Sequence, residues 1–308
     1  MNDFWIILSG SLVAASCGIL GVFLMLRKMS MVGDAISHAV LPGIVIAYLI
    51  SGSRNSEIML LAAALTGVLA SVIIEWLYRK ARVQSDASTG ITFTLLFAIG
   101  VILISRYAGQ VDIDQDCVLF GEIALIPLDL WRTDSGLELG PRAIWLLSAN
   151  FLLVLAFVLK GYRGLFITTF DAAFAAGIGI STAFWHYSLM SFVSLTTVFS
   201  FEAVGAILVV AFLVIPPATA YLLSNDLRRI LLYAVLVGVS SAISGYYFAV
   251  YLNSSVAASM AVASGVHFLL ALLFSPTSGL FFRSRKALSE PGLDSFSRQQ
   301  FPISGKPK

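Results

Sequence analysis

Long apolar runs separated by short polar segments make up most of this sequence. A helix needs about 20 mostly apolar residues to cross the hydrocarbon core of a bilayer. The pattern therefore predicts a bundle of membrane-spanning helices. The runs cover residues 4–26, 34–50, 58–78, 87–106, 142–160, 184–200, 203–224, 229–250 and 256–274. Because the runs on either side of residue 202 are nearly continuous, the pattern alone allows eight or nine spans.

Basic residues occupy every second connection between these runs. They are Arg27 and Lys28, then Arg79, Lys80 and Arg82, then Lys160 and Arg163, then Arg228 and Arg229, and finally Arg283, Arg285 and Lys286. Cytoplasmic loops of membrane proteins carry an excess of Lys and Arg. This alternation fits nine spans with the N-terminus outside and the C-terminus in the cytoplasm. An eight-span chain would break it.

Composition supports the membrane interpretation. Hydrophobic residues make up 58% of the 308 residues, charged residues only 12%, and the mean hydropathy is +0.92. A soluble fold would expose much of that apolar surface to water. The net charge of +2, scattered in short clusters, does not favour a nucleic-acid partner. Cys17 and Cys117 form neither a disulfide framework nor a metal knuckle. We expect an all-α, polytopic integral membrane protein whose first run is a retained span and not a signal peptide.

Two polar regions lie outside the predicted spans. The segment 107–140 is acidic, which can attract cations by local potential or reflect only the retention of basic residues inside. Its charged residues are Asp112, Asp114, Asp116, Glu122, Asp129, Asp134 and Glu138, against Arg132. Residues 283–308, rich in Ser, Gly, Pro and Lys, are predicted to form a disordered cytoplasmic tail after a membrane domain of residues 1–282.

The segment Met31–Gly43 contains the sequence's most unusual pair of residues. Asp34 and His38 are four residues apart at the start of an apolar run. On a helix they would share one face. A carboxylate and an imidazole suit Zn, Mn or Fe, although two ligands do not complete a site. The alternative is that Asp34 caps the helix and His38 is a hydrogen-bonded interior residue. The loop charges place the pair in the inner half of the span.

Prolines interrupt two of the predicted spans. Pro42 and Gly43 should loosen or kink the second run, as is common where helices line a pathway. Pro216 and Pro217 lie in the cytoplasmic half of the run that begins at 203. They predict a helix that bends and gates, or one with a static kink.

The segment 161–183 is a long, weakly charged cytoplasmic connection. Asp171 can cap a short helix that presents Phe174, and Gly177 and Gly179 can end that helix. An apolar helix facing the cytoplasm should dock on a partner. The alternative is a helix lying in the membrane interface.

Other candidate residues carry weaker patterns. Glu202 can line an entry path or contact water at the interface. His267 is expected to be a hydrogen-bonded core residue, and His186 follows the potential interfacial anchor Trp185. The sequence contains no phosphate-binding Gly-Lys-Ser/Thr loop, no His-Glu-x-x-His and no Gly-x-Ser-x-Gly. We therefore expect no enzyme activity in this chain.

Across residues 10–280, the sequence resembles the permeases of metal-ion ABC importers, which take up zinc, manganese or iron. The resemblance is carried by residues 33–43, by 204–216, by Asp86–Ile91, by Phe120–Gly121 and by Phe170–Gly179. Two positions depart from the family pattern. Ala172 replaces a proline that often follows the coupling-helix aspartate, and Asn253–Ala257 replaces a frequent Asp-x-Pro-x-Gly turn.

The resemblance implies a translocating subunit of a bacterial plasma or inner membrane. It implies two cytoplasmic ATP-binding subunits, an extracytoplasmic metal-binding protein and a second permease subunit, either identical or a sister chain. It favours Asp34 and His38 as pathway ligands and residues 170–179 as the coupling helix that contacts the ATPase. No cofactor is implied beyond the transported metal. Two alternatives remain: a permease for a metal chelate or other small solute, and an intramembrane enzyme using Asp34 and His38 as acid and base.

Overall fold

The computed structural model describes residues 2–51, 56–107, 123–132 and 138–275. Within these ranges, nine helical segments are long and apolar enough to cross a membrane. This confirms the nine predicted spans and the all-α fold class. The acidic residues Asp112, Asp114, Asp116, Glu122 and Asp134, the Phe120–Gly121 motif, Cys117 and the tail 283–308 all lie outside the described residues.

The helices follow one another with short connections. Their bounds are α1 Asn2–Leu26, α2 Val32–Ala39, α3 Leu41–Ser51, α4 Ser56–Lys80, α5 Ser85–Tyr107, α7 Arg142–Phe170, α8 Ala172–Gly177, α9 Thr182–Val204, α10 Ala206–Leu223, α11 Leu227–Leu252 and α12 Val256–Phe274. Between α5 and α7 lie the short 3₁₀ helix η1 (Ile123–Leu128) and the antiparallel strands β1 (Leu130–Arg132) and β2 (Glu138–Pro141).

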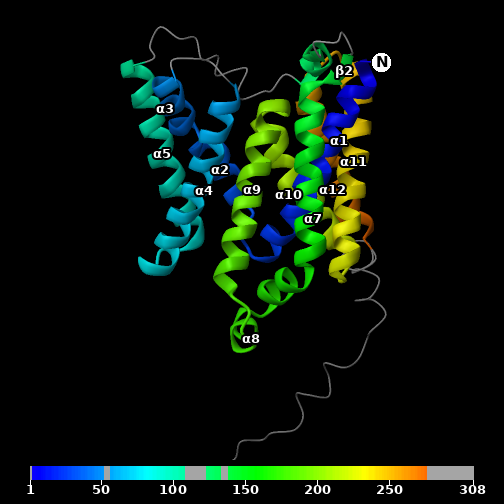
Figure 1. Cartoon of the computed structure of the whole chain (residues 1–308). Helices are drawn as coiled ribbons and strands as arrows, with labels where there is room; N and C mark the ends of the chain where they lie inside the picture. The colour runs from blue at the N-terminus through cyan, green and yellow to red at the C-terminus, as the bar shows by residue number, and fades with distance from the viewer. Residues whose placement is uncertain (1, 52–55, 108–122, 133–137, 276–308) are drawn as a thin grey trace, which may run out of the picture.

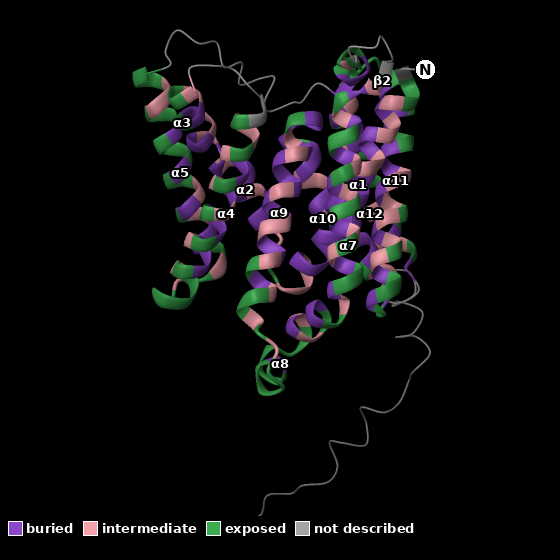
Figure 2. Cartoon of the chain, viewed as in Figure 1, coloured by how far each residue is buried: buried purple, intermediate pink, exposed green. Residues whose placement is uncertain are grey.

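Figure 1 shows two groups of helices. Helices α2, α3, α4 and α5 pack on one another and form what we call the α2–α5 lobe. Helices α1, α7, α9, α10, α11 and α12 form the central bundle, in which α1 and α10 contact most of the other members. The lobe meets the central bundle mainly where α4 and α2 lie against α9. Figure 2 shows that buried residues are concentrated in the central bundle, whereas α8 is largely exposed.

Close approach of helix backbones shapes the core of the central bundle. A Cβ atom on Gly21 of α1 would collide with the carbonyl oxygen of Leu213 and lie 2.8 Å from Cγ of Pro217. A Cβ on Gly245 of α11 would lie 2.8 Å from the backbone nitrogen of Met260. Small residues permit this packing in membranes, where no hydrophobic force drives helices together.

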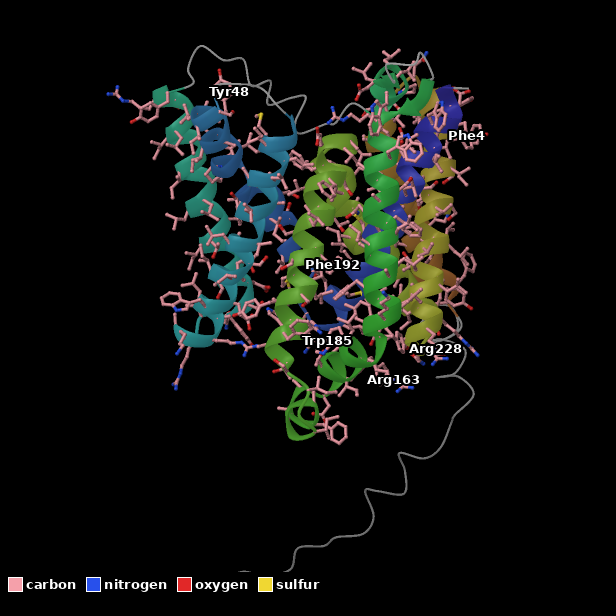
Figure 3. All side chains as sticks on the ribbon, in the orientation of Figure 1. Phe4, Tyr48, Arg163, Trp185, Phe192 and Arg228 are labelled. Carbon is pink, nitrogen blue, oxygen red and sulfur yellow. The ribbon has the colours of Figure 1, made fainter. Side chains whose placement is uncertain are left out.

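All described basic loops lie at one end of the molecule, which we call the basic end. Arg163 and Arg228 are labelled there in Figure 3, while Phe4 and Tyr48 lie at the opposite end. The turns after α1, α4 and α10 and the helix α8 share the basic end. The η1, β1 and β2 segment lies at the other end with the start of α1. The alternation of loop charge therefore corresponds to a real separation in space.

Two helix boundaries differ from the hydropathy pattern. The span predicted to end at residue 160 continues as α7 to Phe170, because Gly161 and Gly164 leave room for the ring of Trp185 to pack against the helix. The uncertain boundary near residue 202 falls at Gly205, whose φ of +83° ends α9 and begins α10. Glycine adopts that conformation without the penalty that a Cβ would bring.

Candidate functional site

Asp34 and His38 lie on one face of α2, as their spacing predicted. Nε2 of His38 is 3.6 Å from Oδ1 of Asp34, and each side chain is 37% exposed. Asp34 is the third residue of α2, preceded by Met31 in the N-cap position, so the capping interpretation of Asp34 is wrong. A carboxylate in the first turn is still favoured by the helix dipole.

Helix α5 forms the other wall of this region. The imidazole of His38 lies 6.0 Å from the ring of Phe93 and 6.1 Å from that of Phe97, measured between ring centroids. A cavity of about 230 Å³ lies beside Asp34, with Asp86, Thr89 and Phe93 in its lining. These residues belong to the half of α5 nearer the basic end. Asp34 therefore lies in the half of its span nearer the basic end.

The bend predicted at Pro42 and Gly43 falls at Val40, where α2 gives way to α3. Pro42 has no N–H, so it cannot make the helical hydrogen bond to the carbonyl of His38. Gly43 lies at a tight crossing with α4, where a Cβ would come within 2.8 Å of the carbonyl oxygen of Ala62. The carbonyl of His38 therefore lacks its usual helical donor, while α3 packs closely on α4 at Gly43.

Pro216 and Pro217 are buried inside α10, which is continuous from Ala206 to Leu223. Neither proline can donate a hydrogen bond, so the carbonyl groups one turn earlier lose their helical partner. One of these belongs to Leu213, and it faces Gly21 of α1. The side chain of Leu213 also packs on Gly33, the residue before Asp34. The prolines thus lie one turn from Leu213, which contacts α2, the helix that carries Asp34 and His38.

The short helix predicted in the segment 161–183 is present as α8. Oδ1 of Asp171 accepts a hydrogen bond from the N–H of Phe174 at 2.8 Å, which makes Asp171 the N-cap. The Phe174 side chain is exposed. Gly179, with a φ of +83°, ends the helix, and the N–H of Ile180 bonds the carbonyl of Ala175 at 2.9 Å. This is a Schellman ending.

Gly177 differs from Gly179 in its surroundings. A Cβ on Gly177 would meet nothing within 4 Å, and its backbone does not require glycine. Only Gly179 is needed to end α8. Phe170, Ile178 and Phe184 are also exposed around α8, so this part of the basic end presents an apolar surface.

A buried ion pair near the basic end was missed by sequence reasoning. Glu75 of α4 and His186 of α9 are both buried, with Nε2 of His186 3.1 Å from Oε2 of Glu75. The guanidinium of Arg79 also pairs with Glu75. An ionisable residue in a membrane span is expensive unless paired. This rule singles out Glu75 as unusual from the sequence alone. Its partner His186 lies too far along the chain to be predicted from the sequence.

Arg27 joins this region from the end of α1. Its guanidinium donates hydrogen bonds to Oγ1 of Thr168, at 3.0 Å, and of Thr169, at 3.1 Å, near the end of α7. Burial lowers the pKa of Arg27 to about 10, and the nearby Glu75 carboxylate acts in the opposite direction. Arg27 therefore stays charged at physiological pH.

The structure also places the two other candidates, His267 and Glu202. Nδ1 of His267 lies 2.7 Å from the carbonyl oxygen of Ala263 and 3.4 Å from Oγ of Ser241. His267 is therefore the hydrogen-bonded residue that was expected. Glu202 lines a cavity of about 600 Å³ at the outer end, together with Asp129 and Arg142.

The nine candidate membrane spans among the described residues define a multi-pass membrane protein. The model of the ABC 3 transport family matches residues 3–275, and the chain belongs to that family. It is 45% identical over 289 residues to the manganese transport system membrane protein MntD of Bacillus subtilis, covering 93% of this chain and 97% of MntD. It is 39% identical over 278 residues to the zinc transport system membrane protein TroD of Treponema pallidum, covering 90% of this chain and 75% of TroD.

A solved structure has the same arrangement of helices. The chain matches one chain of PsaBC from Streptococcus pneumoniae, determined in complex with a Fab, with a TM-score of 0.74 and 29% identity. The match covers 92% of this chain and 94% of that chain. This protein is therefore a permease subunit of the ABC 3 type, located in a bacterial membrane. Within the described residues, no three His, Cys, Asp or Glu side chains gather in a group that could hold a metal ion.

Proposed function

We propose that the chain is the permease of an ATP-driven importer that moves a divalent transition-metal cation into the cytoplasm, with Asp34 and His38 contacting the cation. The observation that carries the proposal is the pair itself. Two ionisable side chains, each 37% exposed, lie inside a membrane span. Such residues are expensive in a bilayer and mark ion pathways. The manganese and zinc systems named for the relatives fit the same chemistry.

The exposure of the pair also supports a second permease subunit. Lipid cannot solvate a carboxylate at this depth, so the face carrying Asp34 and His38 needs a polar or protein neighbour. A second copy of this chain, or a sister permease, would cover that face and supply further ligands. The carbonyl of His38, which Pro42 leaves without its helical donor, is one additional oxygen ligand within this chain. Oxygen and nitrogen ligands together suit manganese, zinc and iron.

The surface around α8 supports an ATP-binding partner. The helix is fixed at both ends, by Asp171 and by Gly179, and presents Phe174 away from the bundle. An exposed apolar patch of this kind marks a protein contact. Replacing Phe174 with Asp should weaken ATPase association by about tenfold or more. Asp226→Asn, an exposed change at the same end but outside α8, is the matched control; equal association of both variants would remove α8 from the contact.

The main test is metal uptake by cells that depend on this chain. Asp34→Ala and His38→Ala should each abolish uptake of Mn²⁺ while the complex still assembles with its ATPase. Ser37→Ala is the matched control, because Ser37 lies between the two residues and bonds only the carbonyl of Gly33. Normal uptake in both Asp34→Ala and His38→Ala would refute the ligand assignment. Competition of Mn²⁺ uptake by Zn²⁺ and Fe²⁺ would then rank the cations.

A further inference from the structure

Four ionisable residues from three parts of the chain converge at the basic end. Glu75 of α4 is at the centre, paired with His186 of α9 and with Arg79 one turn further along α4. Arg27 lies close enough for its charge to interact with Glu75. The Glu75 and His186 side chains are 5% and 9% exposed, whereas that of Arg79 is 56% exposed. Glu75 and His186 therefore form the buried part of this cluster.

The Glu75–His186 pair lies in the interface between α4 and α9, which contains a second polar contact among the described residues. Near the middle of the two helices, Oγ of Ser194 in α9 donates a hydrogen bond to the carbonyl of Ala64 in α4 at 3.2 Å. Beside this contact is an apolar groove of about 280 Å³, lined by Leu61, Ala64, Leu65, Val68, Ser191, Phe192 and Leu195. The Glu75–His186 contact is a second, buried polar contact between the two helices, and separating it would remove one of the buried partners of the Glu75 carboxylate.

The same pair is close to α8 along the chain. Helix α9 begins at Thr182, five residues after α8 ends, and its N-cap Ser181 accepts a hydrogen bond from the N–H of Phe184 at 3.2 Å. His186 follows in the first turns of α9. On the other side of α8, Arg27 binds Thr168 and Thr169, just before the cap residue Asp171. Both helices that flank α8 are thus bonded into the region around Glu75.

Helix α4 runs from Glu75 to a contact with α2, the helix that carries Asp34 and His38. A Cβ on Gly67 would collide with Oγ of Ser194 and lie 3.0 Å from Cγ2 of Ile36. Ile36 lies between Asp34 and His38 on α2. A displacement of α4 relative to α9 would therefore reach α2 through direct contact at Gly67.

We propose that Glu75 and His186 are positioning residues that transmit movement of α8 through α9 to the α2–α5 lobe. The inference rests on the proposed function, because it assigns α8 to the ATPase contact and α2 to the cation. The pair keeps α4 attached to the start of α9, so the lobe follows α9 when the ATPase moves α8. A purely structural pair would fix the two helices without affecting how ATP use is converted into transport.

The experiment measures Mn²⁺ uptake and ATP hydrolysis by the complete complex in liposomes. Glu75→Gln and His186→Gln should lower uptake per ATP hydrolysed by about tenfold, and the double variant should be no worse than either single one. Asp226→Asn is the matched control, because Asp226 forms an exposed ion pair with Arg229 at the same end. An unchanged ratio of uptake to ATP hydrolysis, including a parallel fall of both rates, would overturn the proposal.

A cross-link tests the same idea within one variant. Glu75→Cys with His186→Cys, in a chain whose Cys17 and Cys117 are replaced by Ser, should be uncoupled when reduced. A short thiol cross-linker should restore uptake per ATP about fivefold, because it replaces the ion pair with a covalent connection. Equal ratios before and after cross-linking would overturn the proposal, whatever the variant's absolute activity.

The two proposals fail in different ways. If the unmodified complex does not import Mn²⁺, the proposed function is wrong. If it does import Mn²⁺, and Asp34→Ala abolishes that uptake while Glu75→Gln keeps the normal ratio of uptake to hydrolysis, only the coupling inference is wrong.

Discussion

Helices α1 and α4 have the same length, 25 residues, but very different surroundings. In the most apolar stretch of α1, 78% of the residues are buried, against 39% in α4. Helix α1 is enclosed by α7, α10 and α11, whereas α4 is bonded to the central bundle mainly along α9. The candidate cation-binding residues Asp34 and His38 lie on α2, in the same lobe as α4. The region with the tighter packing and the region with the proposed transport residues are thus different, and the proposed residues lie in the less tightly packed one.

The largest expected effect tests the close packing of α1 in the central bundle. Gly21→Val in α1 would force a side chain against the carbonyl of Leu213 and against Pro217, and should destabilise the fold by about 3 kcal/mol or more. The measurement is the melting temperature of the purified protein in detergent. Gly18→Ala, whose Cβ would lie 3.4 Å from the carbonyl of Ala234, should lower it far less.

The matching change in the lobe is Gly90→Ala in α5, where a Cβ would meet nothing within 4 Å. It should leave the melting temperature unchanged or raise it slightly, since alanine favours the helix by about 0.5–1 kcal/mol. Similar losses for Gly21→Val and Gly90→Ala would contradict the contrast between the two regions.

A smaller effect is expected where the regions meet. Gly67→Ala should cost about 1–2 kcal/mol, because its Cβ would collide with Ser194 and press on Ile36. Adding Ser194→Ala removes the hydroxyl and should recover about 1 kcal/mol, giving a measurable coupling in a double-mutant cycle. Strictly additive losses would show that α4 and α9 are not in contact at this crossing.

The next effect, on α8, is local. Gly179→Ala places a Cβ on a residue with a φ of +83° and should weaken the helix by about 1 kcal/mol. Gly177→Ala should strengthen it by a similar amount, because Gly177 needs no special backbone conformation. Hydrogen exchange of the amides of residues 172–180 measures both. Changes of the same sign would mean that the Schellman ending does not hold α8.

The smallest expected change in stability is at the cation pair. Asp34→Ala and His38→Ala should each alter the free energy of unfolding by less than about 0.5 kcal/mol, as is typical of partly exposed ion pairs. Their effect should fall on uptake instead. A large drop in melting temperature for either variant would make the pair structural and remove the distinction between lobe and central bundle.

Local patterns in the sequence predicted much of this structure. Nine apolar runs, the bend near Pro42, the cap formed by Asp171 and the shared face of Asp34 and His38 all depend on residues close together in the chain. The same is true of the gathering of the described basic loops at one end. The hydropathy pattern predicted that the fifth span ends at residue 160, because polar residues follow there. The helix continues to Phe170, and Trp185 packs on Gly161 and Gly164 in this extension.

Contacts between distant segments could not be predicted in this way. His186 was interpreted only by its position beside Trp185, yet it pairs with Glu75, 111 positions earlier in the chain. The surroundings of Asp34 depend on α5 and α10, and nothing in the spacing of Asp34 and His38 indicates which helices those are. Helix faces in a membrane are uniformly apolar, so periodicity does not select neighbours.

The single residue that joins α9 to α10 has a mechanical consequence. Because Gly205 alone connects the two helices at the end opposite the basic end, a movement of α9 relative to α10 would have to be a tilt about this residue and not a lengthwise slide. Helix α9 then acts as a lever about 34 Å long, from 23 residues at 1.5 Å each. A tilt of roughly 5° would move its far end by about 3 Å while leaving the outer end in place. The end of α9 opposite Gly205 carries His186.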